Sequence, residues 1–136
     1  MTDAAAVLVG EQVDALRAIA PHIGITAVEQ QGFSVFVSFV RRREGRQYTL
    51  RLNAEGWPAQ LASATFVDPT SREDVGPEVW PADGEQAIKR TSNPRFICLP
   101  GIREYHASHG ALQPNVHNSS LVSIVQQIIA AVEARG

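Results

Sequence analysis

Two alternating stretches decide the fold class: Phe33-Ser34-Val35-Phe36-Val37-Ser38-Phe39 and, shortly after it, Tyr48-Thr49-Leu50-Arg51-Leu52-Asn53. In both stretches an apolar residue occupies every second position, so these side chains fall on one face of a β-strand. The charged segment Arg41–Arg46 lies between them and contains Gly45. This order predicts a β-hairpin with one buried face and a solvated turn, for which contact with an acidic partner is the alternative role.

The hairpin extends in both directions into a longer run of strands. The period of two begins at Ile25 and continues to Val67. A loop follows Asn53, and a further strand is expected over Leu61–Val67 before Asp68-Pro69-Thr70 ends it. Because all the connections are short, we expect about four strands in consecutive antiparallel order, which is a meander.

A helix is expected on each side of this meander. Residues 3–20 carry an apolar stripe with helical spacing, formed by Val9, Val13, Leu16 and Ala20, and Pro21 ends the pattern. The second helix is expected from about Ser119 to Ala134, with Asn118 or Ser119 as its N-cap. Its apolar stripe consists of Leu121, Val125, Ile128, Ile129 and Val132.

Between the meander and the closing helix, the sequence carries no sustained period. Residues 68–97 are rich in proline, glycine and charge, and we expect an irregular segment that Trp80 and Ile88 hold in place. A short apolar run, Phe96–Leu99, precedes Pro100-Gly101, and residues 103–117 are expected to form a loop. The whole chain, residues 1–136, is therefore expected to be a single α+β domain, with helices packed against an antiparallel sheet.

Composition excludes several classes of protein. The chain has 136 residues, of which 44% are hydrophobic, and 12 Lys+Arg against 14 Asp+Glu give a formal net charge of −2. This balance is not typical of a disordered chain or of a nucleic-acid-binding domain. Its longest apolar stretches, Ala4–Val9 and Ile128–Val132, are far shorter than the roughly 20 residues of a membrane span. No basic region precedes the first apolar run, so we expect a cytoplasmic protein without a secretory signal.

Cys98 is the first candidate for chemistry, because it is the only cysteine and sits where regular structure is expected to end. No intrachain disulfide or multi-cysteine zinc site is possible. Its commonest role would be packing, since single cysteines usually behave as small buried hydrophobes. Three histidines follow within 19 residues, however: His106, His109 and His117. A nearby imidazolium would lower the pKa of the thiol and favour the thiolate.

These histidines leave three interpretations open. Cys98 with His106 or His109 would form the nucleophile and base of a cysteine peptidase, although the local signatures of known peptidases are absent. Cys98 with the three histidines would supply enough ligands for zinc, although their spacing matches no common zinc finger. In the third interpretation they are ordinary loop histidines that face solvent.

The order of the elements and several local sequences resemble the ubiquitin-conjugating (UBC) family. Tyr48–Asn53, followed by Gly56-Trp57-Pro58 and Ala64–Asp68, is similar to that family's third strand, aromatic-proline loop and fourth strand. Phe96-Ile97-Cys98-Leu99 is similar to the segment that holds the catalytic cysteine, and Ser119–Val132 to the central helix. The resemblance covers nearly the whole chain and implies a UBC-like fold with Cys98 in the catalytic position.

The sequence departs from the eukaryotic members of that family. Their His-Pro-Asn tripeptide is replaced by Ser92-Asn93-Pro94, which lies closer to Cys98. The two helices that usually end the fold are missing, and the loop after the cysteine holds Tyr105-His106-Ala107-Ser108-His109. These features resemble bacterial UBC-like proteins, which are typically encoded beside an activating-enzyme-like protein, a ubiquitin-like modifier and a deubiquitinase-like peptidase, often in antiphage defence operons.

The resemblance implies that the chain is a transferase. Cys98 would accept a ubiquitin-like protein from an activating enzyme as a thioester, and would pass it to an amine of a target protein. His109 and His106 are the candidates to assist attack by the amine, and Asn93 is the candidate to stabilise the oxyanion. No cofactor or metal is expected in this chain, because ATP is used upstream. The alternative is a catalytically inactive UBC-like module that binds a ubiquitin-like protein or scaffolds a complex.

Overall fold

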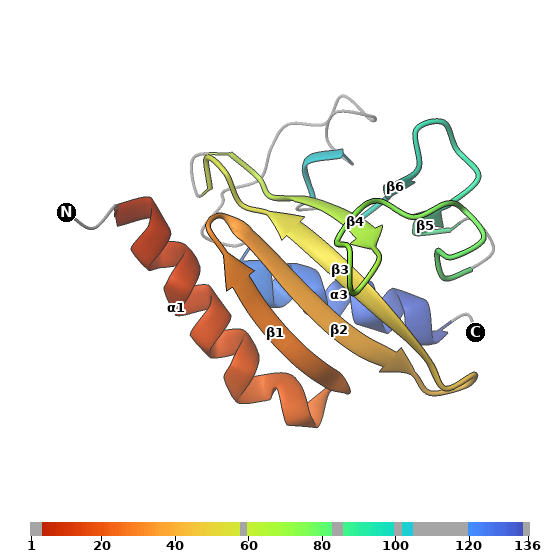
Figure 1. Ribbon diagram of the computed structural model, residues 1–136, viewed down its shortest axis with the longest axis horizontal. Coiled ribbons are helices and arrows are strands. Elements are labelled where there is room, and N and C mark those ends of the chain that lie inside the picture. The colour runs from red at the N-terminus through yellow and green to blue at the C-terminus, as the bar shows by residue number, and fades with distance from the viewer. Residues whose placement is uncertain (1–3, 58–59, 83–85, 100–101, 105–119, 135–136) are drawn as a thin grey trace.

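A computed structural model describes residues 4–57, 60–82, 86–99, 102–104 and 120–134 (Figure 1). Helix α1 (Ala4–Ile19) continues into the short 3₁₀ helix η1 (Ala20–His22). Six strands follow: β1 (Ile25–Gln31), β2 (Ser34–Arg41), β3 (Arg46–Asn53), β4 (Ser63–Val67), β5 (Ile88–Lys89) and β6 (Phe96–Ile97). Helix α3 (Leu121–Ala134) ends the described chain. This order confirms the α+β class, with a helix at each end of a four-stranded antiparallel sheet.

The four long strands form one antiparallel sheet in the order β1-β2-β3-β4, which confirms the predicted meander. Its register brings the apolar positions of neighbouring strands together: Val37 pairs with Leu50, and Leu50 pairs with Phe66. All three side chains are at most 1% exposed. The fourth strand begins at Ser63 instead of the predicted Leu61, because the preceding residues already contact the chain that follows Cys98.

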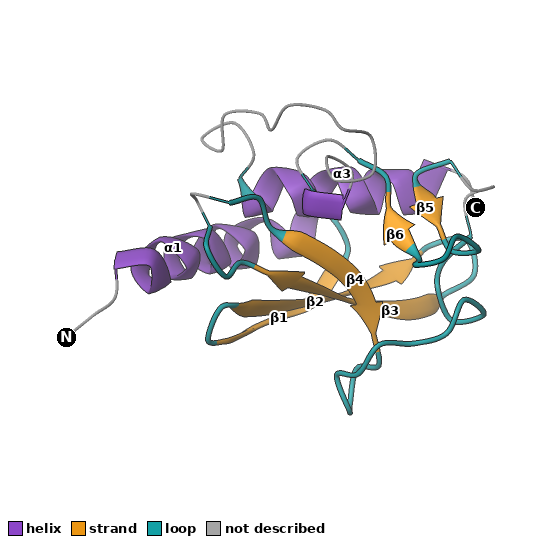
Figure 2. Cartoon of the chain, turned by 90° about the horizontal axis from the view of Figure 1, so that it is seen from above, coloured by secondary structure: helices purple, strands orange, loops and turns teal. Residues whose placement is uncertain are grey.

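Both helices cover the same face of the sheet, as Figure 2 shows. Val9, Val13 and Leu16 of α1 are buried there, as predicted, and so are the five predicted apolar residues of α3 together with Ile124. One polar contact joins the helices, since the Gln12 side-chain oxygen accepts the backbone N–H of Leu121 at 3.1 Å. Burial on a common face therefore places α1 and α3 as a single layer on the sheet.

The predicted N-cap of α3 is wrong by at least one residue. The Ser120 hydroxyl accepts the backbone N–H of Ser123 at 3.1 Å, and the Ser120 carbonyl accepts that of Ile124 at 3.1 Å. Serine is a favoured N-cap because its side-chain oxygen accepts one of the otherwise unpaired N–H groups of the first turn. Asn118 and Ser119, which the sequence analysis named, lie outside the described residues.

The face of the sheet that points away from the helices is partly covered, which the simple alternation did not predict. The hydroxyls of Ser38 and Thr49 hydrogen-bond to each other at 3.0 Å and are buried. Residues 68–76 follow β4, and from this segment the guanidinium of Arg72 lies 4.1 Å from the centre of the Phe36 ring. Arg72 also pairs with Glu29 on β1. The loop after β4 therefore contacts the outer face of the strands it follows.

The prediction of a fully solvated turn over Arg41–Arg46 is wrong for its first residue. Arg41 is only 5% exposed, and its guanidinium donates a hydrogen bond to the carbonyl of Ala82 at 2.7 Å. The Glu44 carboxylate lies 3.4 Å from the same guanidinium and accepts the Tyr48 hydroxyl at 2.6 Å. A buried arginine needs such polar partners, because a charge without them is costly to desolvate.

Residues 68–97 are largely irregular, as expected, and are held by the two predicted apolar anchors. Trp80 is 3% exposed and Ile88 is fully buried. Two short strands within this segment were not predicted: β5 and β6 pair as Ile88↔Ile97 and Lys89↔Phe96. None of the described helices has the length and apolar character that a membrane span needs.

Candidate functional site

Strand β6 sets the position of Cys98. Ile97 is fully buried and pairs with Ile88 of β5, so the chain is fixed one residue before the cysteine. The backbone N–H of Cys98 then donates to the carbonyl of Ala87 at 2.6 Å. β6 lies beside β4 at the edge of the main sheet (Figure 1). Cys98 therefore directly follows a paired strand, and a hydrogen bond still fixes its backbone.

Cys98 is half-buried, in contrast to the fully buried Ile97 before it. Its position therefore differs from that of a core cysteine, which would be closed off from reagents in solution. A half-exposed thiol on a held backbone can act as a nucleophile in its thiolate form. If Cys98 served only to pack the core, its side chain would be more completely buried than it is.

Arg103 anchors the chain after Cys98 to the loop between β3 and β4. The backbone N–H of Arg103 donates to the Ala62 carbonyl at 2.9 Å. Its guanidinium donates to the carbonyl of Leu61 at 2.9 Å and to that of Glu55 at 3.1 Å. A single arginine therefore joins the segment after the cysteine to the loop between β3 and β4.

Glu104 adds a second anchor beside the first. One oxygen of its carboxylate accepts both the Ser63 hydroxyl and the Ala64 backbone N–H, each at 2.9 Å. The Ala64 N–H belongs to the outer edge of β4, where it would otherwise lack a strand partner. We call Arg103 and Glu104 the β4-edge clamp. Together with buried Ile102, the clamp fixes the chain downstream of Cys98 as β6 fixes it upstream.

Asn93, the predicted oxyanion residue, lies on the other side of β6. It is exposed and lines a cavity of about 190 Å³, whose other walls include Thr65, Asp74 and Trp80. The Asn93–Pro94 peptide bond is cis. Asn93 thus precedes β6 and Cys98 follows it. Among the described residues, the neighbours of Asn93 are those that line the cavity.

His106 and His109, the predicted assisting residues, lie outside the described residues, as does His117. Their distances from Cys98 therefore stay untested, and so do the peptidase and zinc interpretations that depend on them. Within the described ranges, no three His, Cys, Asp or Glu side chains form a group that could hold a metal ion.

The two tryptophans near this region are buried anchors, as expected for Trp80. Trp57 is 7% exposed and Trp80 is 3% exposed. The Trp80 ring meets that of Phe66 edge-on, with ring centres 5.1 Å apart, which ties the irregular segment to β4. Neither indole N–H has a hydrogen-bond partner among the described residues.

The β4-edge clamp was not among the residues predicted from the sequence. Arg103 and Glu104 act through backbone groups about 40 residues earlier in the chain, and neither stands at a periodic position. No local signal distinguishes such residues from solvated ones. A pocket of about 550 Å³ between α3 and the start of β1 was not predicted either, because its walls come from distant parts of the chain.

No protein-family model matches this chain, and no curated protein sequence matches it.

Proposed function

We propose that the chain is a ubiquitin-conjugating-like carrier, in which Cys98 receives a ubiquitin-like protein as a thioester and passes it to a target amine. One observation carries this proposal: the only cysteine is half-buried at the end of β6, between two anchored stretches of backbone. A carrier cysteine must meet a protein thioester, so it needs access to solvent together with a defined position.

The first step is an exchange of thioesters. The Cys98 thiolate attacks the carbonyl carbon at the C-terminus of the modifier, which is bound to a cysteine of the activating enzyme. The bond between that carbonyl and the activating enzyme breaks, and the enzyme's thiolate leaves. The modifier is then held on Cys98 through a new thioester of similar energy, so no cofactor of this chain is consumed.

The second step transfers the modifier to an amine. The amine nitrogen attacks the thioester carbonyl, the Cys98 thiolate leaves, and an amide forms while the amine loses a proton. We assign removal of this proton to His109 or His106, and stabilisation of the oxyanion to Asn93. Because Asn93 lies before β6, its role requires that the modifier's C-terminus extend along this strand.

The partners follow from the same proposal. A modifier protein, an activating enzyme and a protein target would act on the chain in the cytoplasm, in a bacterial antiphage conjugation system. The exposed side of α1 supports one contact, because Val7 and Leu8 are 44% and 38% exposed there. The outer face of the sheet is the second proposed contact, beyond the part that Arg72 covers.

A charging assay tests the carrier function. The chain is mixed with ATP and with the activating enzyme and ubiquitin-like protein encoded beside its gene, and the products are separated with and without a thiol reagent. We expect an adduct that the reagent removes, that Cys98→Ala abolishes, and that becomes resistant to the reagent in Cys98→Ser. An adduct that persists in Cys98→Ala would contradict the assignment, and no adduct would favour the inactive binding module.

The histidines are tested by discharge of the charged protein to free lysine. His109→Ala or His106→Ala should leave charging of Cys98 intact while slowing discharge, by roughly the 10²-fold typical of a lost general base. Asn93→Asp, which changes the charge but little of the shape, should also slow discharge. Equal discharge rates in wild type and both histidine variants would remove the histidines from the mechanism.

A further inference from the structure

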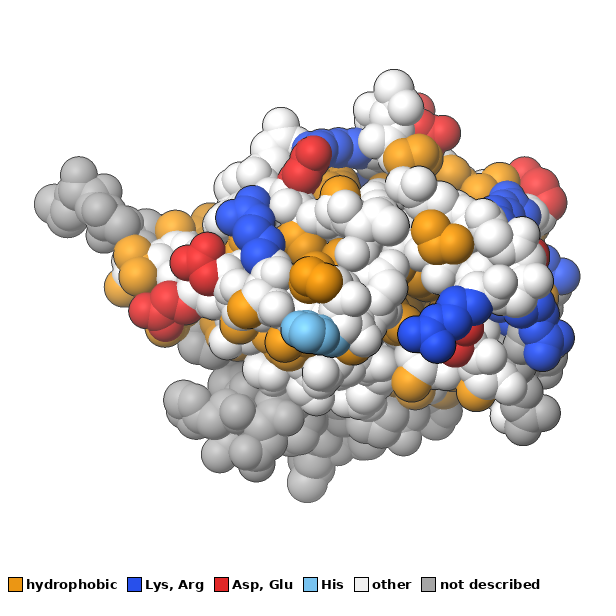
Figure 3. All heavy atoms as spheres, turned by 90° about the horizontal axis from the view of Figure 1, so that it is seen from below, with side chains coloured by type: hydrophobic (Ala, Val, Ile, Leu, Met, Phe, Trp, Pro, Cys, Tyr) orange, Lys and Arg blue, Asp and Glu red, His pale blue; other side chains and the backbone are white. Residues whose placement is uncertain are grey.

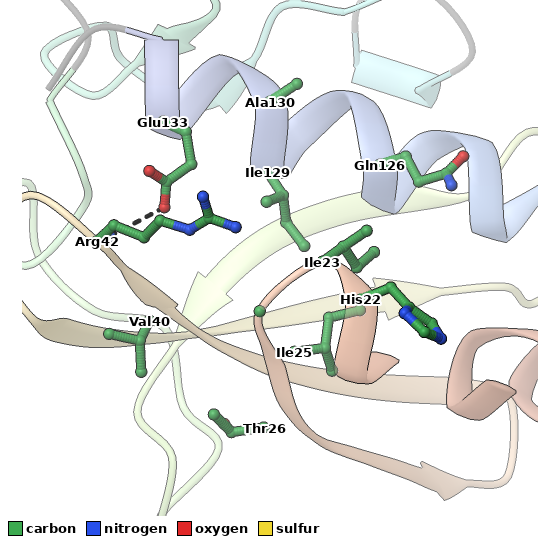
Figure 4. Close-up of a pocket in the computed structure, with 11 residues that line it drawn as sticks. His22, Ile23, Ile25, Thr26, Val40, Arg42, Gln126, Ile129, Ala130 and Glu133 are labelled. Carbon is green, nitrogen blue, oxygen red and sulfur yellow. Dashed lines mark hydrogen bonds between the residues drawn. The ribbon is translucent and has the colours of Figure 1, made fainter. Parts of the chain in front are cut away.

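A pocket lies away from Cys98, on the opposite side of α3 from β6 (Figures 1 and 4). Its volume is about 550 Å³, which is within the usual range for ligand sites. Ile25 of β1 and Ile129 of α3 form its floor and are 7% and 8% exposed. Half-buried Ile23 and Val40 add apolar surface beside them. The floor is thus apolar and recessed.

The rim of this pocket is held in place by a contact between distant parts of the chain. The backbone N–H of Arg42, in the turn after β2, donates to the Glu133 carboxylate of α3 at 3.0 Å. A second backbone bond, from Val40 N–H to the Gly24 carbonyl at 3.5 Å, joins the walls contributed by β2 and the start of β1. The pocket is therefore built on regular elements that these contacts hold together.

Exposed arginines outnumber carboxylates beside the pocket, where Glu133 is the acidic residue of the lining and Arg42 the basic one. Arg41 and Glu44 pair with each other, which leaves Arg42, Arg43 and Arg46 as exposed cationic groups of the same turn. The guanidinium of Arg42 has no ion-pair partner among the described residues. Figure 4 shows it between Glu133 and Ile129 at the edge of the pocket, and Figure 3 shows a histidine and a group of basic side chains, with acidic atoms against it, on the same face.

We propose that this pocket binds an acidic peptide segment of a partner protein, with one large apolar side chain on the isoleucine floor and flanking Asp or Glu residues against Arg42 and Arg43. A guanidinium favours carboxylates because it can donate two parallel hydrogen bonds. At such sites a buried apolar anchor usually supplies most of the affinity, and the charged rim orients the ligand. This site is independent of Cys98 and of the thioester carrier function.

Other partners with negative charge fit the surface less well. A membrane surface would require apolar side chains that protrude, whereas Ile25 and Ile129 are recessed. Single-stranded nucleic acid would require an exposed ring for base stacking, and the nearest aromatic residue of the turn, Tyr48, is 4% exposed. The arginines and the pocket together therefore favour a peptide with both charge and an apolar side chain.

Selection from a random peptide library on the immobilised full chain tests the proposal without a known ligand. Enriched peptides should carry Asp or Glu beside a large aliphatic or aromatic residue. Binding of a labelled enriched peptide should weaken by about tenfold or more in Ala130→Glu, which places a carboxylate in the pocket, and in Arg42→Glu. Both sites are exposed, so thermal unfolding should show that each variant remains folded.

The matched control is Gln127→Glu, which makes the same change in charge as Ala130→Glu at an exposed site of α3 that does not line the pocket. It should bind the peptide as wild type does, and so should Cys98→Ala. No enrichment, enriched peptides without acidic residues, or equal binding by Ala130→Glu and Gln127→Glu would each overturn the proposal. Binding to anionic lipid vesicles that Ala130→Glu and Arg42→Glu abolish, without peptide binding, would overturn it in favour of a membrane surface.

Discussion

The Cys98 segment and the pocket beside α3 are both built on the same four-stranded sheet, but they are held in different ways. Around Cys98, short strands and the β4-edge clamp fix an otherwise irregular chain through single hydrogen bonds to backbone groups. Around the pocket, α3, β1 and β2 supply the walls directly. The Cys98 segment should therefore respond to loss of one side chain, whereas the walls of the pocket, apart from the rim contact of Glu133, should change only when the core does.

This difference also concerns how each region could work. A carrier cysteine must be approached by several proteins in turn, and local opening of a loop segment at low cost in free energy permits that. A docking pocket on regular elements stays formed without its ligand, which lowers the cost of ordering on binding. The four predictions below run from the largest expected effect to the smallest.

Removal of a core ring from the sheet that carries both regions should have the largest effect. Phe66 is 1% exposed and lies near three other aromatic rings, including those of Tyr48 and Trp80. Phe66→Ala should lower the free energy of unfolding by about 3–5 kcal/mol, because it leaves a cavity that neighbours cannot fill. Urea unfolding followed by circular dichroism measures the loss. A loss similar to that of an exposed substitution such as Gln127→Ala would contradict this view of the core.

Loss of the clamp should separate the two regions. Glu104→Ala removes the acceptor of both the Ser63 hydroxyl and the Ala64 N–H, so it should cost about 1.5–3 kcal/mol of unfolding free energy. Alkylation of Cys98 by iodoacetamide in native buffer should become faster, while peptide binding at the pocket stays unchanged. Glu104→Gln keeps one acceptor oxygen and should have the smaller effect. Equal effects of the two variants would contradict the hydrogen-bond explanation.

Neighbouring arginines provide a sharper comparison within one turn. Arg41 is buried and bound to the Ala82 carbonyl, whereas Arg42 is exposed. Arg41→Ala should destabilise the protein by about 1–3 kcal/mol, since it leaves polar partners unpaired. Arg42→Ala should change the free energy of unfolding by at most about 0.5 kcal/mol while weakening peptide binding. Thermal unfolding of both variants checks the first effect, and the reverse order would contradict the assignment of their roles.

The smallest effect should be the pH dependence of stability that arises from Glu44 and Tyr48, the pair at the base of this turn. The hydrogen bond from the Tyr48 hydroxyl is the main reason why the pKa of Glu44 lies below its ordinary value of 4.5. Burial, followed by the bond to Glu44, raises the pKa of Tyr48 above 10.0. The contribution of Glu44 is therefore present above its ordinary pKa and is lost as the pH falls through the lowered value. That of Tyr48 is present below its ordinary pKa and is lost as the pH rises through the raised value.

Tyr48→Phe tests this pair with little change in shape. The variant should lose less of its remaining stability than wild type does at both the acid and the alkaline extreme. NMR titration of the Glu44 carboxyl carbon should show its pKa return toward the ordinary value in Tyr48→Phe. An unchanged Glu44 titration in the variant would show that the hydroxyl is not the cause of the shift.

The sheet and helices could be predicted from the sequence because alternation and helical spacing report burial on one face. Val35, Val37, Leu50 and Leu52 are all fully buried where the pattern of two requires. The burial of Arg41 could not be predicted, since its partner Ala82 is 41 residues away and a run of arginines normally indicates solvent. Long-range bonds from a single side chain leave no period in the sequence.

The candidate site could be predicted only in part. Cys98 stands out because it is the only cysteine, and its position at the end of a short apolar run agrees with its place after β6. The cavity around Asn93 could not be predicted, because Thr65 and Trp80 reach it from separate parts of the chain. The same reason hides the pocket beside α3, where Ile25 and Ile129 meet across about 100 residues of sequence.

The reactivity of Cys98 in the folded protein tests the central claim most directly. The native chain and a urea-denatured sample are treated with iodoacetamide, and the carbamidomethylated fraction is followed by intact mass, with Cys98→Ala as the control for other sites. We expect Cys98 to react without denaturant, at a rate that urea raises only modestly, because its side chain is half-buried and its backbone is fixed by a hydrogen bond. A cysteine that stays unmodified until the protein unfolds would contradict it, and would make Cys98 a packing residue.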